Sequence, residues 1–411
     1  MLDTGNTAWL TMATILVMLM TVPALALFYG GLVRSKNLLS VLMQCMICTA
    51  VGSILWIAVG YSWVFGTGFA DSAASSFIGG LEKSFLCGVG IGSVIQGPQV
   101  PEITFALFQC MFAVITPALM IGAFAERLRF SAFLLFTILW SLIIYYPMAH
   151  FVWGGGWLQQ MGALDFAGGT VVHINAGVSA LVLALMLGRR TDYRPNRPIP
   201  AQNVPFVFIG AAMLWLGWFG FNAGSGLKAD GLDANAFLVT HLATSVAALT
   251  WMVIDWLHSG KPTTVGFCTG AVAGLVAITP AAGSVSVLGA VTIGITTSVV
   301  CYIMVAFVKG RLGYDDALDA FGVHGIGGIV GSVLTGVFAT AAVSGGPSGA
   351  LYGNWHQLYV QVVATLFTIV YSGVVTFILY KIVDVMIGMR VAPREEEEGL
   401  DVYEHGESAY N

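Results

Sequence analysis

Long apolar runs recur along almost the whole chain, and they restrict its fold more than any other feature. A helix needs about 20 apolar residues to cross a bilayer. Of the 411 residues, 57% are hydrophobic and 9% are charged, whereas soluble domains contain about 25% charged residues. We therefore predict an all-α membrane protein with eleven transmembrane helices. The runs lie at residues 8–32, 39–65, 101–124, 131–150, 169–188, 203–223, 236–256, 264–280, 285–308, 322–342 and 357–388.

The first run follows the N-terminal residues MLDTGNTAW. It has no basic segment before it and no small-residue cleavage site after it, so we interpret it as a spanning helix and not as a signal peptide. The six cysteines are scattered, and their spacing fits neither a zinc site nor a disulfide framework. The charge distribution offers no basic surface for nucleic acid. We expect no metal, no cofactor and no enzymatic activity.

Lysine and arginine residues are distributed unevenly between the loops. One set of alternate loops, together with the C-terminal end, holds 14 of the 16 basic residues. The opposite set holds only Lys83 and Lys228. Basic residues mark the cytoplasmic side of a membrane protein. The N-terminus is therefore predicted outside and the C-terminus in the cytoplasm.

A charged segment, RRTDYRPNRPIP at 189–200, divides the chain into two halves of five runs each. Because five is odd, the second half starts on the opposite side and must be inverted, as in many transporters. The tail contains four consecutive glutamates, and such runs are typically solvated, mobile ends. We predict a first five-helix repeat at 1–195, an inverted repeat at 196–345, an eleventh transmembrane helix within 346–391 and a tail at 392–411.

One histidine lies in the fifth run of each half. His173 lies in GGTVVHINAG (168–177) and His324 in GVHGIGGIVG (322–331). In both motifs the histidine follows a valine and precedes a glycine by four residues. Ionisable groups at membrane depth are costly and usually functional. Two neutral imidazoles, the form that burial favours, could share a proton and line an apolar conduit.

Two other interpretations of these histidines stay open. A buried histidine is often a core residue bonded to a backbone carbonyl. Two histidines on different helices can also be the axial ligands of haem.

Aromatic and hydroxyl residues cluster near the outer ends of several runs. Aromatic faces and a hydroxyl oxygen can hold a cation, although an interfacial aromatic belt would have a similar composition. The cluster comprises Phe105, Phe108 and Phe112 on one helix face with Gln109 beside them, Trp153, and then Trp218, Phe221 and Ser225.

The energies decide which cation such a cluster could pass. Each aromatic ring contributes about 0.5–2 kcal/mol to cation binding, whereas full removal of water from an ion costs on the order of 20 kcal/mol. Aromatics can therefore recruit a small cation but cannot carry it bare through an apolar centre. Ammonium can leave its proton behind and cross as a neutral molecule, but potassium cannot.

Asp165 lies just before the fifth run, where it is expected to cap the helix. Its charge would also favour cations at the outer mouth. Asp319 is placed similarly before the tenth run, after Asp315 and Asp316.

Taken together, several motifs resemble the ammonium transporter family (Amt/MEP/Rh), and most closely its bacterial AmtB-like branch. The resemblance extends from about residue 5 to the tail and implies a homotrimer in the bacterial plasma (inner) membrane, with one pore per subunit. The motifs are FYGGLVRSKN (28–37), AERLRFS (125–131), HFVWGGG (150–156), LDFAGGTVVHINAG (164–177), GWFGFNAGS (217–225) and FGVHG (321–325).

The resemblance also implies roles for individual residues. Ser225, Trp153, Phe108 and Phe112 would bind ammonium near Asp165. Phe112 and Phe221 would form the gate, and His173 and His324 would line the pore. Supporting pore-side residues would be Gln109, Phe28, Tyr29, Tyr145 and Trp218.

Two segments qualify this resemblance. The outer loop at 66–100 is longer than in the family. The tail sequence GLDVYEHGESAYN is similar to the C-terminus that meets PII-type (GlnK) signalling proteins in the AmtB-like branch. An ammonium sensor and a Rh-like gas channel are the alternative functions. The lack of a kinase or cyclase domain after the last run favours a transporter over a sensor, and Trp153 and Ser225 favour cation recruitment over a gas channel.

Overall fold

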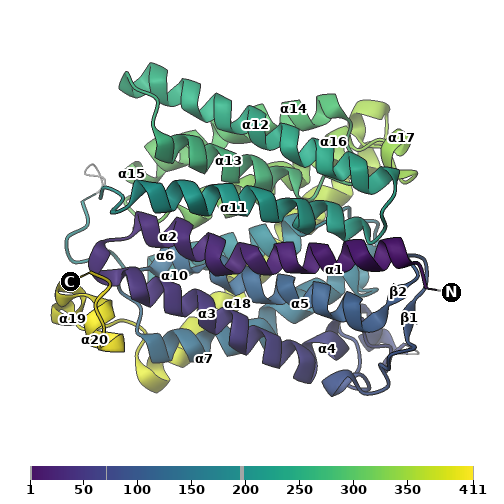
Figure 1. The fold of residues 1–411 in the computed structure, drawn as a ribbon, viewed down its shortest axis with the longest axis horizontal. Helices are drawn as coiled ribbons and strands as arrows, with labels where there is room; N and C mark the ends of the chain where they lie inside the picture. Colours follow the sequence, from purple (N-terminus) through teal and green to yellow (C-terminus); the bar gives the residue numbers. More distant parts are fainter. Residues whose placement is uncertain (1, 71, 195–198, 411) are drawn as a thin grey trace.

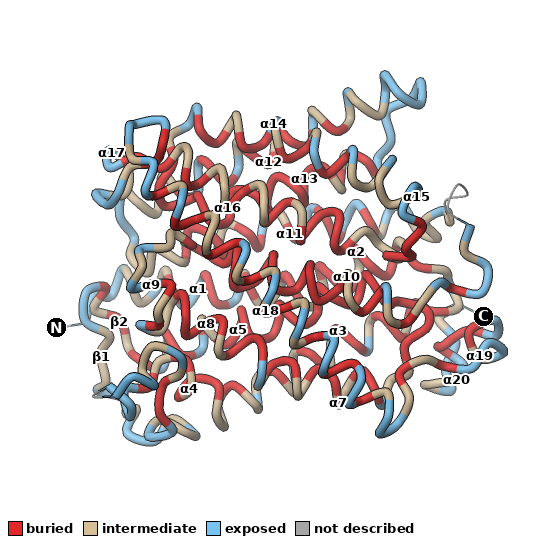
Figure 2. Tube along the Cα trace, turned by 180° about the vertical axis from the view of Figure 1, so that it is seen from behind, coloured by how far each residue is buried: buried red, intermediate tan, exposed pale blue. Residues whose placement is uncertain are grey.

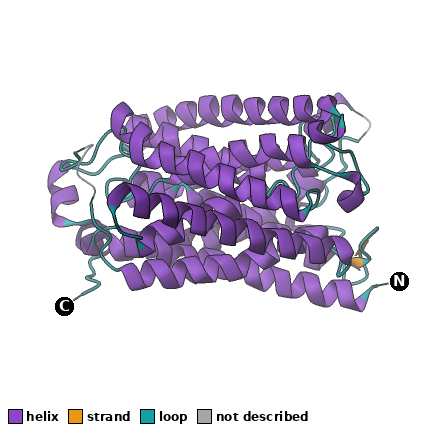
Figure 3. Cartoon of the chain, turned by 90° about the horizontal axis from the view of Figure 1, so that it is seen from above, coloured by secondary structure: helices purple, strands orange, loops and turns teal. Residues whose placement is uncertain are grey.

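Helices run side by side along the long axis of the molecule (Figure 1). The computed structural model describes residues 2–70, 72–194 and 199–410. The predicted boundary between the two halves, at 195/196, lies outside these residues. The two termini lie at opposite ends of the helix bundle in two perpendicular views (Figures 1 and 3). We call these ends the N-terminal end and the tail end.

Ten helical stretches in the described part of the chain are long and apolar enough to cross a membrane. An eleventh, Thr264–Ile278, is apolar but shorter. The prediction of an all-helical membrane protein is therefore confirmed, with about ten or eleven apolar helices. The ten stretches are Thr4–Leu32, Ser35–Phe65, Glu102–Phe124, Phe130–Gln160, Gly169–Leu187, Val204–Gly226, Gly231–Ser259, Val287–Leu312, Phe321–Phe338 and Trp355–Ile387.

Short irregular turns divide most of these stretches into separate α-helices. The helices are α1 (Thr4–Leu19), α2 (Ala26–Leu32), α3 (Leu38–Leu55), α4 (Tyr61–Phe65), α5 (Glu102–Leu119), α6 (Ile121–Phe124), α7 (Phe130–Trp140), α8 (Tyr146–Trp153), α9 (Trp157–Gln160), α10 (Asn175–Leu187), α11 (Val204–Asn222), α12 (Gly231–Ser259), α13 (Thr264–Ile278), α14 (Val287–Ile303), α15 (Lys309–Leu312), α16 (Ile326–Phe338), α17 (Ala341–Ser344), α18 (Trp355–Ile387), α19 (Pro393–Glu398) and α20 (Leu400–His405). Strands β1 (Val94–Ile95) and β2 (Val100–Pro101) pair antiparallel.

Turns of π-helix interrupt the long stretches at several points. Such turns are rare in proteins, and many of those that occur lie at functional sites. Two of them contain the predicted pore histidines, because His173 lies in Gly169–Ile174 and His324 in Phe321–Gly325. The others are Met20–Leu25, Trp56–Gly60, Ser141–Tyr145 and Met304–Val308, and short 3₁₀ turns lie at Ser35–Asn37, Ala73–Ser76, Ser84–Leu86, Ala223–Gly226 and Ala350–Tyr352.

Buried residues line the middle of the bundle, and exposed residues concentrate in the loops at its two ends (Figure 2). Several outer helices also expose large apolar side chains, such as Leu249 on α12, Leu288 on α14 and Val370 on α18. Lipid tails are as apolar as these side chains, so such faces need no protein cover in a bilayer.

A buried polar stripe on α18 attaches this helix to α10 and to the loop before it. Gln361 accepts a hydrogen bond from the backbone nitrogen of Leu164 at 2.7 Å. Further along α18, Ser372 donates to Asn175 at 2.7 Å and Thr376 donates to Ser179 at 2.8 Å. Polar contacts of this kind hold helices together inside a membrane.

A network of buried charges joins four loops at the tail end. Arg190 lies 2.7 Å from Glu126 and 2.8 Å from Asp315, and Arg34 lies 2.7 Å from Glu126. Burial alone would raise the pKa of both carboxyls. The neighbouring guanidinium groups outweigh burial and hold the pKa of Glu126 and that of Asp315 below their ordinary values.

The acidic run in the tail is folded onto the bundle, which corrects the expectation of a mobile end. Glu396 is 1% exposed. Its carboxylate accepts hydrogen bonds from the backbone nitrogen of Thr191 at 2.7 Å and from Arg390 at 2.8 Å. The glutamate run therefore supplies a buried acceptor for donors on two neighbouring segments and is not simply a solvated end.

The next helix of the tail, α20, supplies hydrogen-bond acceptors to the first turn of α3. The carboxylate of Asp401 accepts hydrogen bonds from the backbone nitrogens of Leu39 at 3.0 Å and Ser40 at 2.8 Å. These nitrogens belong to the first turn of α3, where a helix has no partners of its own for them. His405 also packs edge-on against Phe130, with ring centroids 5.1 Å apart.

The 66–100 loop at the N-terminal end is anchored by a buried carboxylate. Glu102 accepts hydrogen bonds from Lys83 at 2.6 Å and from Tyr61 at 2.8 Å. This places Lys83, one of the two basic residues predicted outside, in an ion pair with the first turn of α5.

Removal of the central arginine of the buried network should destabilise the protein strongly. We expect Arg190→Ala to lower the free energy of unfolding by about 3–5 kcal/mol, because it removes the closest ion-pair partner of buried Asp315 and one of the two arginines that pair with buried Glu126. Since folding lowers the pKa of these carboxyls, their stabilising effect is present near neutral pH and is lost as the pH falls through the lowered values. The free energy of unfolding, measured in detergent at pH 7 and at about pH 4, should therefore differ less between Arg190→Ala and wild type at the lower pH.

Arg394→Ala is the matched control, because this arginine pairs only with the exposed Glu398 four residues later. It should leave stability nearly unchanged. An Arg190→Ala protein as stable as this control would contradict a structural role for the network.

Candidate functional site

The helix that contains His173 begins at a buried carboxylate. Asp165 accepts hydrogen bonds from the backbone nitrogens of Gly168 at 2.9 Å, Thr170 at 2.8 Å and Val171 at 3.1 Å. These bonds satisfy donors that a helix start leaves free, so the capping prediction is confirmed. Attraction of cations by Asp165 stays a prediction.

The helix that contains His324 begins in the same way, but with a different aspartate from the one singled out in the sequence. Asp316 accepts hydrogen bonds from the backbone nitrogens of Ala320 at 3.0 Å and Phe321 at 2.8 Å. Asp319 instead forms an ion pair with Lys309. Asp316 precedes His324 by eight residues, which is also the separation of Asp165 and His173, and this repeated spacing could have identified the cap.

The glycine four residues after each histidine lets the two helices cross at the histidines. A Cβ atom on Gly177 would lie 2.2 Å from the backbone nitrogen of Gly325, next to His324. A Cβ atom on Gly328 would lie 3.1 Å from Cβ of His173. Each glycine thus gives room to the histidine segment of the other helix, and larger residues at these positions would push the histidines apart.

The two imidazole rings face each other at the centre of the bundle. Their centroids lie 5.4 Å apart and their planes differ by 16°. His173 is 1% exposed and His324 is 3% exposed. Both ring nitrogens of His173, and Nδ1 of His324, have no hydrogen-bond partner among the described residues. The interpretation of these histidines as core residues bonded to backbone carbonyls is therefore wrong.

A continuous row of aromatic rings leads from the N-terminal end to His173. The centroids of Phe108 and Phe112 lie 5.1 Å apart, and those of Phe112 and Phe221 lie 4.3 Å apart. The ring of Phe221 lies 6.0 Å from that of His173. The structure thus brings the predicted gate phenylalanines together, directly next to one of the histidines.

Trp153 and Ser225 flank this row. The ring of Trp153 lies 5.8 Å from that of Phe112, and its indole nitrogen donates to the backbone oxygen of Asp165 at 2.8 Å. Ser225 is half-buried and donates to the backbone oxygen of Phe221 at 2.8 Å. All four predicted ammonium-binding residues therefore lie on or next to the phenylalanine row.

Trp218 also lies against His173. The indole and imidazole centroids lie 5.4 Å apart, with planes 19° apart. The indole nitrogen donates to the hydroxyl oxygen of Thr279 at 2.9 Å. No pattern in the sequence connected Thr279 with the predicted site, since the two residues are 61 positions apart.

A narrow cavity follows the phenylalanine pair. The space open to the centre of a water molecule is about 10 Å³, close to what one water needs. This volume excludes the haem interpretation, because a porphyrin could not fit between the rings. The lining residues are Met20, Leu25, Phe28, Ile115, Leu119, Val172, His173, Leu214, Trp218, Phe221, Val272 and His324.

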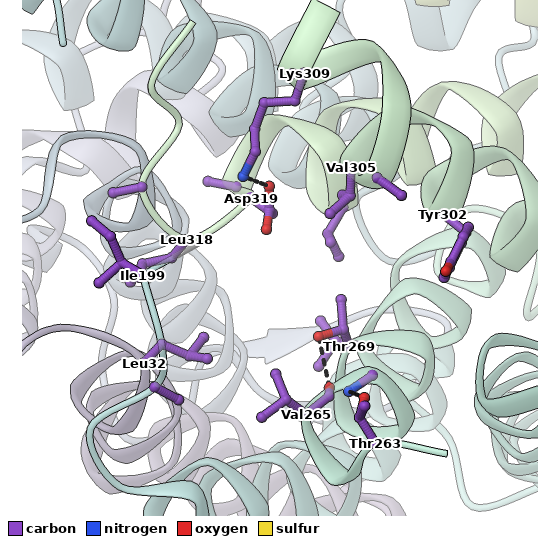
Figure 4. A pocket seen from close by; sticks show the side chains of 18 of the residues that line it. Leu32, Ile199, Thr263, Val265, Thr269, Tyr302, Val305, Lys309, Leu318 and Asp319 are labelled. Carbon is purple, nitrogen blue, oxygen red and sulfur yellow. Dashed lines mark hydrogen bonds and ion pairs between the residues drawn. The ribbon is translucent and has the colours of Figure 1, made fainter. Parts of the chain in front are cut away.

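A much larger cavity, of about 1100 Å³, lies at the tail end. Phe28, Val272 and His324 line both cavities, so the narrow cavity adjoins the wide one at His324. Lys309 and Asp319 point toward each other at the wall of the wide cavity (Figure 4). Tyr29 also lines it, with its hydroxyl donating to the backbone oxygen of Leu119 at 3.0 Å.

Some residues of the predicted cluster lie elsewhere. Tyr145 packs between Trp140 and Tyr146, with centroid distances of 6.2 and 5.9 Å, and lines neither cavity. Phe105 packs against Phe65 at 5.0 Å instead of joining Phe108 and Phe112. Gln109 lies on the same helix and is half-buried.

This arrangement suits the passage of a small neutral molecule that can hydrogen-bond. The narrow cavity is apolar except for the imidazoles and the indole nitrogen, and it offers no charge to balance a bare ion. In the part of the chain that the structure describes, no group of three or more His, Cys, Asp or Glu residues could hold a metal.

Comparisons with known proteins give a consistent result. A family model described as the Ammonium Transporter Family matches residues 8–410. An ammonium transporter from Aquifex aeolicus is 52% identical, and the match covers 100% of this chain and 94% of the relative. The crystal structure of Saccharomyces cerevisiae Mep2 has a TM-score of 0.87 and 37% identity, with 95% of this chain and 88% of that chain covered. A structure titled Sensor Amt Protein has a TM-score of 0.89 and 30% identity, with 98% of each chain covered.

Substitution of the crossing glycines should destabilise the protein in a defined order. Gly177→Ala should lower the free energy of unfolding by about 1–3 kcal/mol, because the added methyl group meets backbone atoms that cannot move aside independently. Gly328→Ala should cost less, since its nearest neighbours lie at 3.0–3.1 Å and include side-chain atoms. Unfolding of the purified variants in detergent measures both effects.

Gly231→Ala is the control, because a Cβ atom there has no neighbour within 4 Å. Its stability should stay within about 0.5 kcal/mol of wild type. Equal stability of the Gly177→Ala and Gly231→Ala proteins would show that the helix crossing does not depend on glycine.

Proposed function

The chain belongs to the ammonium transporter family, and on this premise we propose that it recruits ammonium at an aromatic site, removes a proton and conducts ammonia past His173 and His324. The observation that carries this proposal is the pair of stacked, buried imidazoles whose nitrogens lack partners and line a cavity one water wide. Unpartnered nitrogens of this kind are available to a polar molecule that passes.

Recruitment would take place where Phe108, Phe112, Trp153 and Ser225 lie close to one another. The aromatic faces stabilise a cation by about 0.5–2 kcal/mol each, and the hydroxyl oxygen of Ser225 can accept a hydrogen bond from it. Asp165 lies next to this group through its bond with Trp153. Its carboxylate is already engaged by backbone donors, so it would act mainly through its charge.

Deprotonation would take place at or just beyond the gate of Phe112 and Phe221. The rings are 4.3 Å apart, so a hydrated ion cannot pass between them without movement. The cost of dehydration favours loss of the proton at this point. Ammonia then crosses the narrow cavity, where the imidazoles can exchange hydrogen bonds with it, and the proton travels separately or stays behind.

For the architecture, we propose eleven transmembrane helices in two inverted five-helix repeats, 1–195 and 196–345, followed by a helix within 346–391. The short α13 would be the eighth span. Three features support a two-fold relationship between the halves. They are the equal sequence separation between cap and histidine, the π-helical turn at each histidine and the glycine that follows each histidine by four residues. The position of the termini at opposite ends of the bundle supports an odd number of spans.

For the location, we propose the bacterial plasma (inner) membrane, with the N-terminus outside and the C-terminus in the cytoplasm. The distribution of basic residues supports this orientation. The phenylalanine row would then open outward and the wide cavity inward. Phe28, Tyr29 and Trp218 line one or both cavities and would assist passage, whereas Tyr145 and Gln109 would support the walls.

For the assembly, we propose a homotrimer with one pore in each subunit and a PII-type (GlnK) partner at the cytoplasmic face. The exposed apolar faces of the outer helices are compatible with contacts to lipid or to further subunits. Within the described part of the tail, Glu396 bonds to Thr191 and Arg390 beside the proposed inner mouth, where a partner protein could contact the tail.

An ammonium sensor is the second candidate, since the structure titled Sensor Amt Protein has the same fold. The two functions differ in whether substrate crosses the membrane. Ammonium-dependent current or uptake in proteoliposomes would favour the transporter, and binding without flux would favour the sensor.

Loss of both histidines should change what the pore conducts. In proteoliposomes, we expect His173→Ala combined with His324→Ala to lose proton-coupled ammonium current or to admit potassium, because the imidazoles that order the passing molecule are gone. The measurement is current with ammonium against potassium. His356→Ala, at an exposed position, is the control and should conduct like wild type. Full selective transport by the double variant would remove the histidines from the mechanism.

Loss of the serine hydroxyl should weaken recruitment. We expect Ser225→Ala to raise the ammonium concentration for half-maximal current about three- to tenfold, the usual effect of losing one hydrogen bond, with little change in the maximum. Ser245→Ala is the matched control, because its hydroxyl also donates to the carbonyl four residues earlier, at 2.9 Å. A shift equal to that of the control would exclude Ser225 from the site.

A further inference from the structure

Two near-parallel rings flank His173, and its own ring nitrogens have no partner among the described residues. Trp218 lies against one side of the imidazole and His324 against another, both at 5.4 Å and within 19° of parallel. An imidazole without hydrogen bonds can rotate unless its neighbours prevent it. The orientation of His173 therefore depends on the orientation of the indole.

The indole in turn depends on one hydrogen bond. Its nitrogen donates to the hydroxyl oxygen of Thr279 at 2.9 Å. That hydroxyl donates its own hydrogen to the backbone oxygen of Leu275 at 2.8 Å, so the oxygen is left as an acceptor for the indole. Thr279 is fully buried, and water cannot readily replace it as the partner of Trp218.

Thr279 lies on a rigid support that also touches the start of the histidine helix. It ends α13, and the backbone oxygen of Pro280 accepts a hydrogen bond from Phe166 at 3.2 Å. Pro280 packs so closely on Gly169 that a Cβ atom there would lie 2.5 Å from it. One short segment therefore fixes both the indole and the first turn of the helix that contains His173.

From this geometry we infer that Thr279 is a positioning residue for the pore, which acts through the indole of Trp218 to keep His173 parallel to His324. The inference rests on the proposed function of the histidine pair. Thr279 does not line the narrow cavity, so it need not touch the substrate. Its hydroxyl selects one rotation of the indole, and the indole face holds the imidazole.

Thr279→Val tests this inference because valine keeps the shape and loses the hydroxyl. Ammonium current in proteoliposomes should fall about tenfold, since the indole nitrogen is left without an acceptor. Thr279→Ser should stay within about twofold of wild type, because it restores the bond. Thr279→Ala is measured in parallel, so that the result does not rest on the folding of one variant.

A double-mutant cycle separates positioning from general stability. In the Trp218→Phe background, which has no indole nitrogen, Thr279→Val should cause no further loss of current. Thr244→Val is the matched control, since Thr244 is also buried and donates to the carbonyl four residues earlier, at 2.6 Å, but accepts no indole bond in the described structure. It should leave the current unchanged.

Two results would overturn the inference. One is a Thr279→Val protein that conducts like wild type. The other is an equal loss of current in the wild-type and Trp218→Phe backgrounds. Either result would leave the proposed function intact, because wild-type current and the effect of the double histidine variant are measured independently.

Discussion

The high cost of moving a charge out of water determines the layout of this molecule. Idealised transfer of an ion into a medium of low polarity costs on the order of 20 kcal/mol, and a few aromatic contacts recover only part of it. The middle of the bundle accordingly contains imidazoles, an indole and hydroxyls but no paired ions along the narrow cavity. Full charges are placed at the two ends, where Lys83 meets Glu102 and Arg190 meets Glu126 and Asp315. In the proposed pore, such an arrangement would favour neutral molecules.

The same constraint explains how the histidines are held. A strong hydrogen bond to the protein would orient each imidazole but would also occupy the nitrogen that a passing molecule needs. In the structure the rings are instead flanked by near-parallel neighbouring rings, and their helices cross closely at Gly177 and Gly328. Two helices start inside the protein, where their first backbone nitrogens have no water to bond. Asp165 and Asp316 accept hydrogen bonds from these nitrogens. The imidazole rings are thereby oriented without using their nitrogens, which stay available for hydrogen bonds.

Periodic and local features of the molecule could be predicted from the sequence, and contacts between distant segments could not. Apolar run length predicted the spanning helices, and position before a run predicted the Asp165 cap. Residue type alone did not distinguish Asp316 from Asp319, although the eight-residue spacing shared with Asp165 and His173 would have done so. The acidic tail looked solvated because its partners, Thr191 and Ser40, lie far away in the chain. The bond between Trp218 and Thr279 likewise joins two helices whose spacing is set only by packing.

The contact of Asp401 with the first turn of α3 has a consequence for biosynthesis. The two partners are 361 positions apart, so α3 is synthesised long before Asp401. The first turn of α3 therefore lacks these hydrogen-bond partners until Asp401 has been added to the chain. A chain that stops before Asp401 would leave the backbone nitrogens of Leu39 and Ser40 without these acceptors.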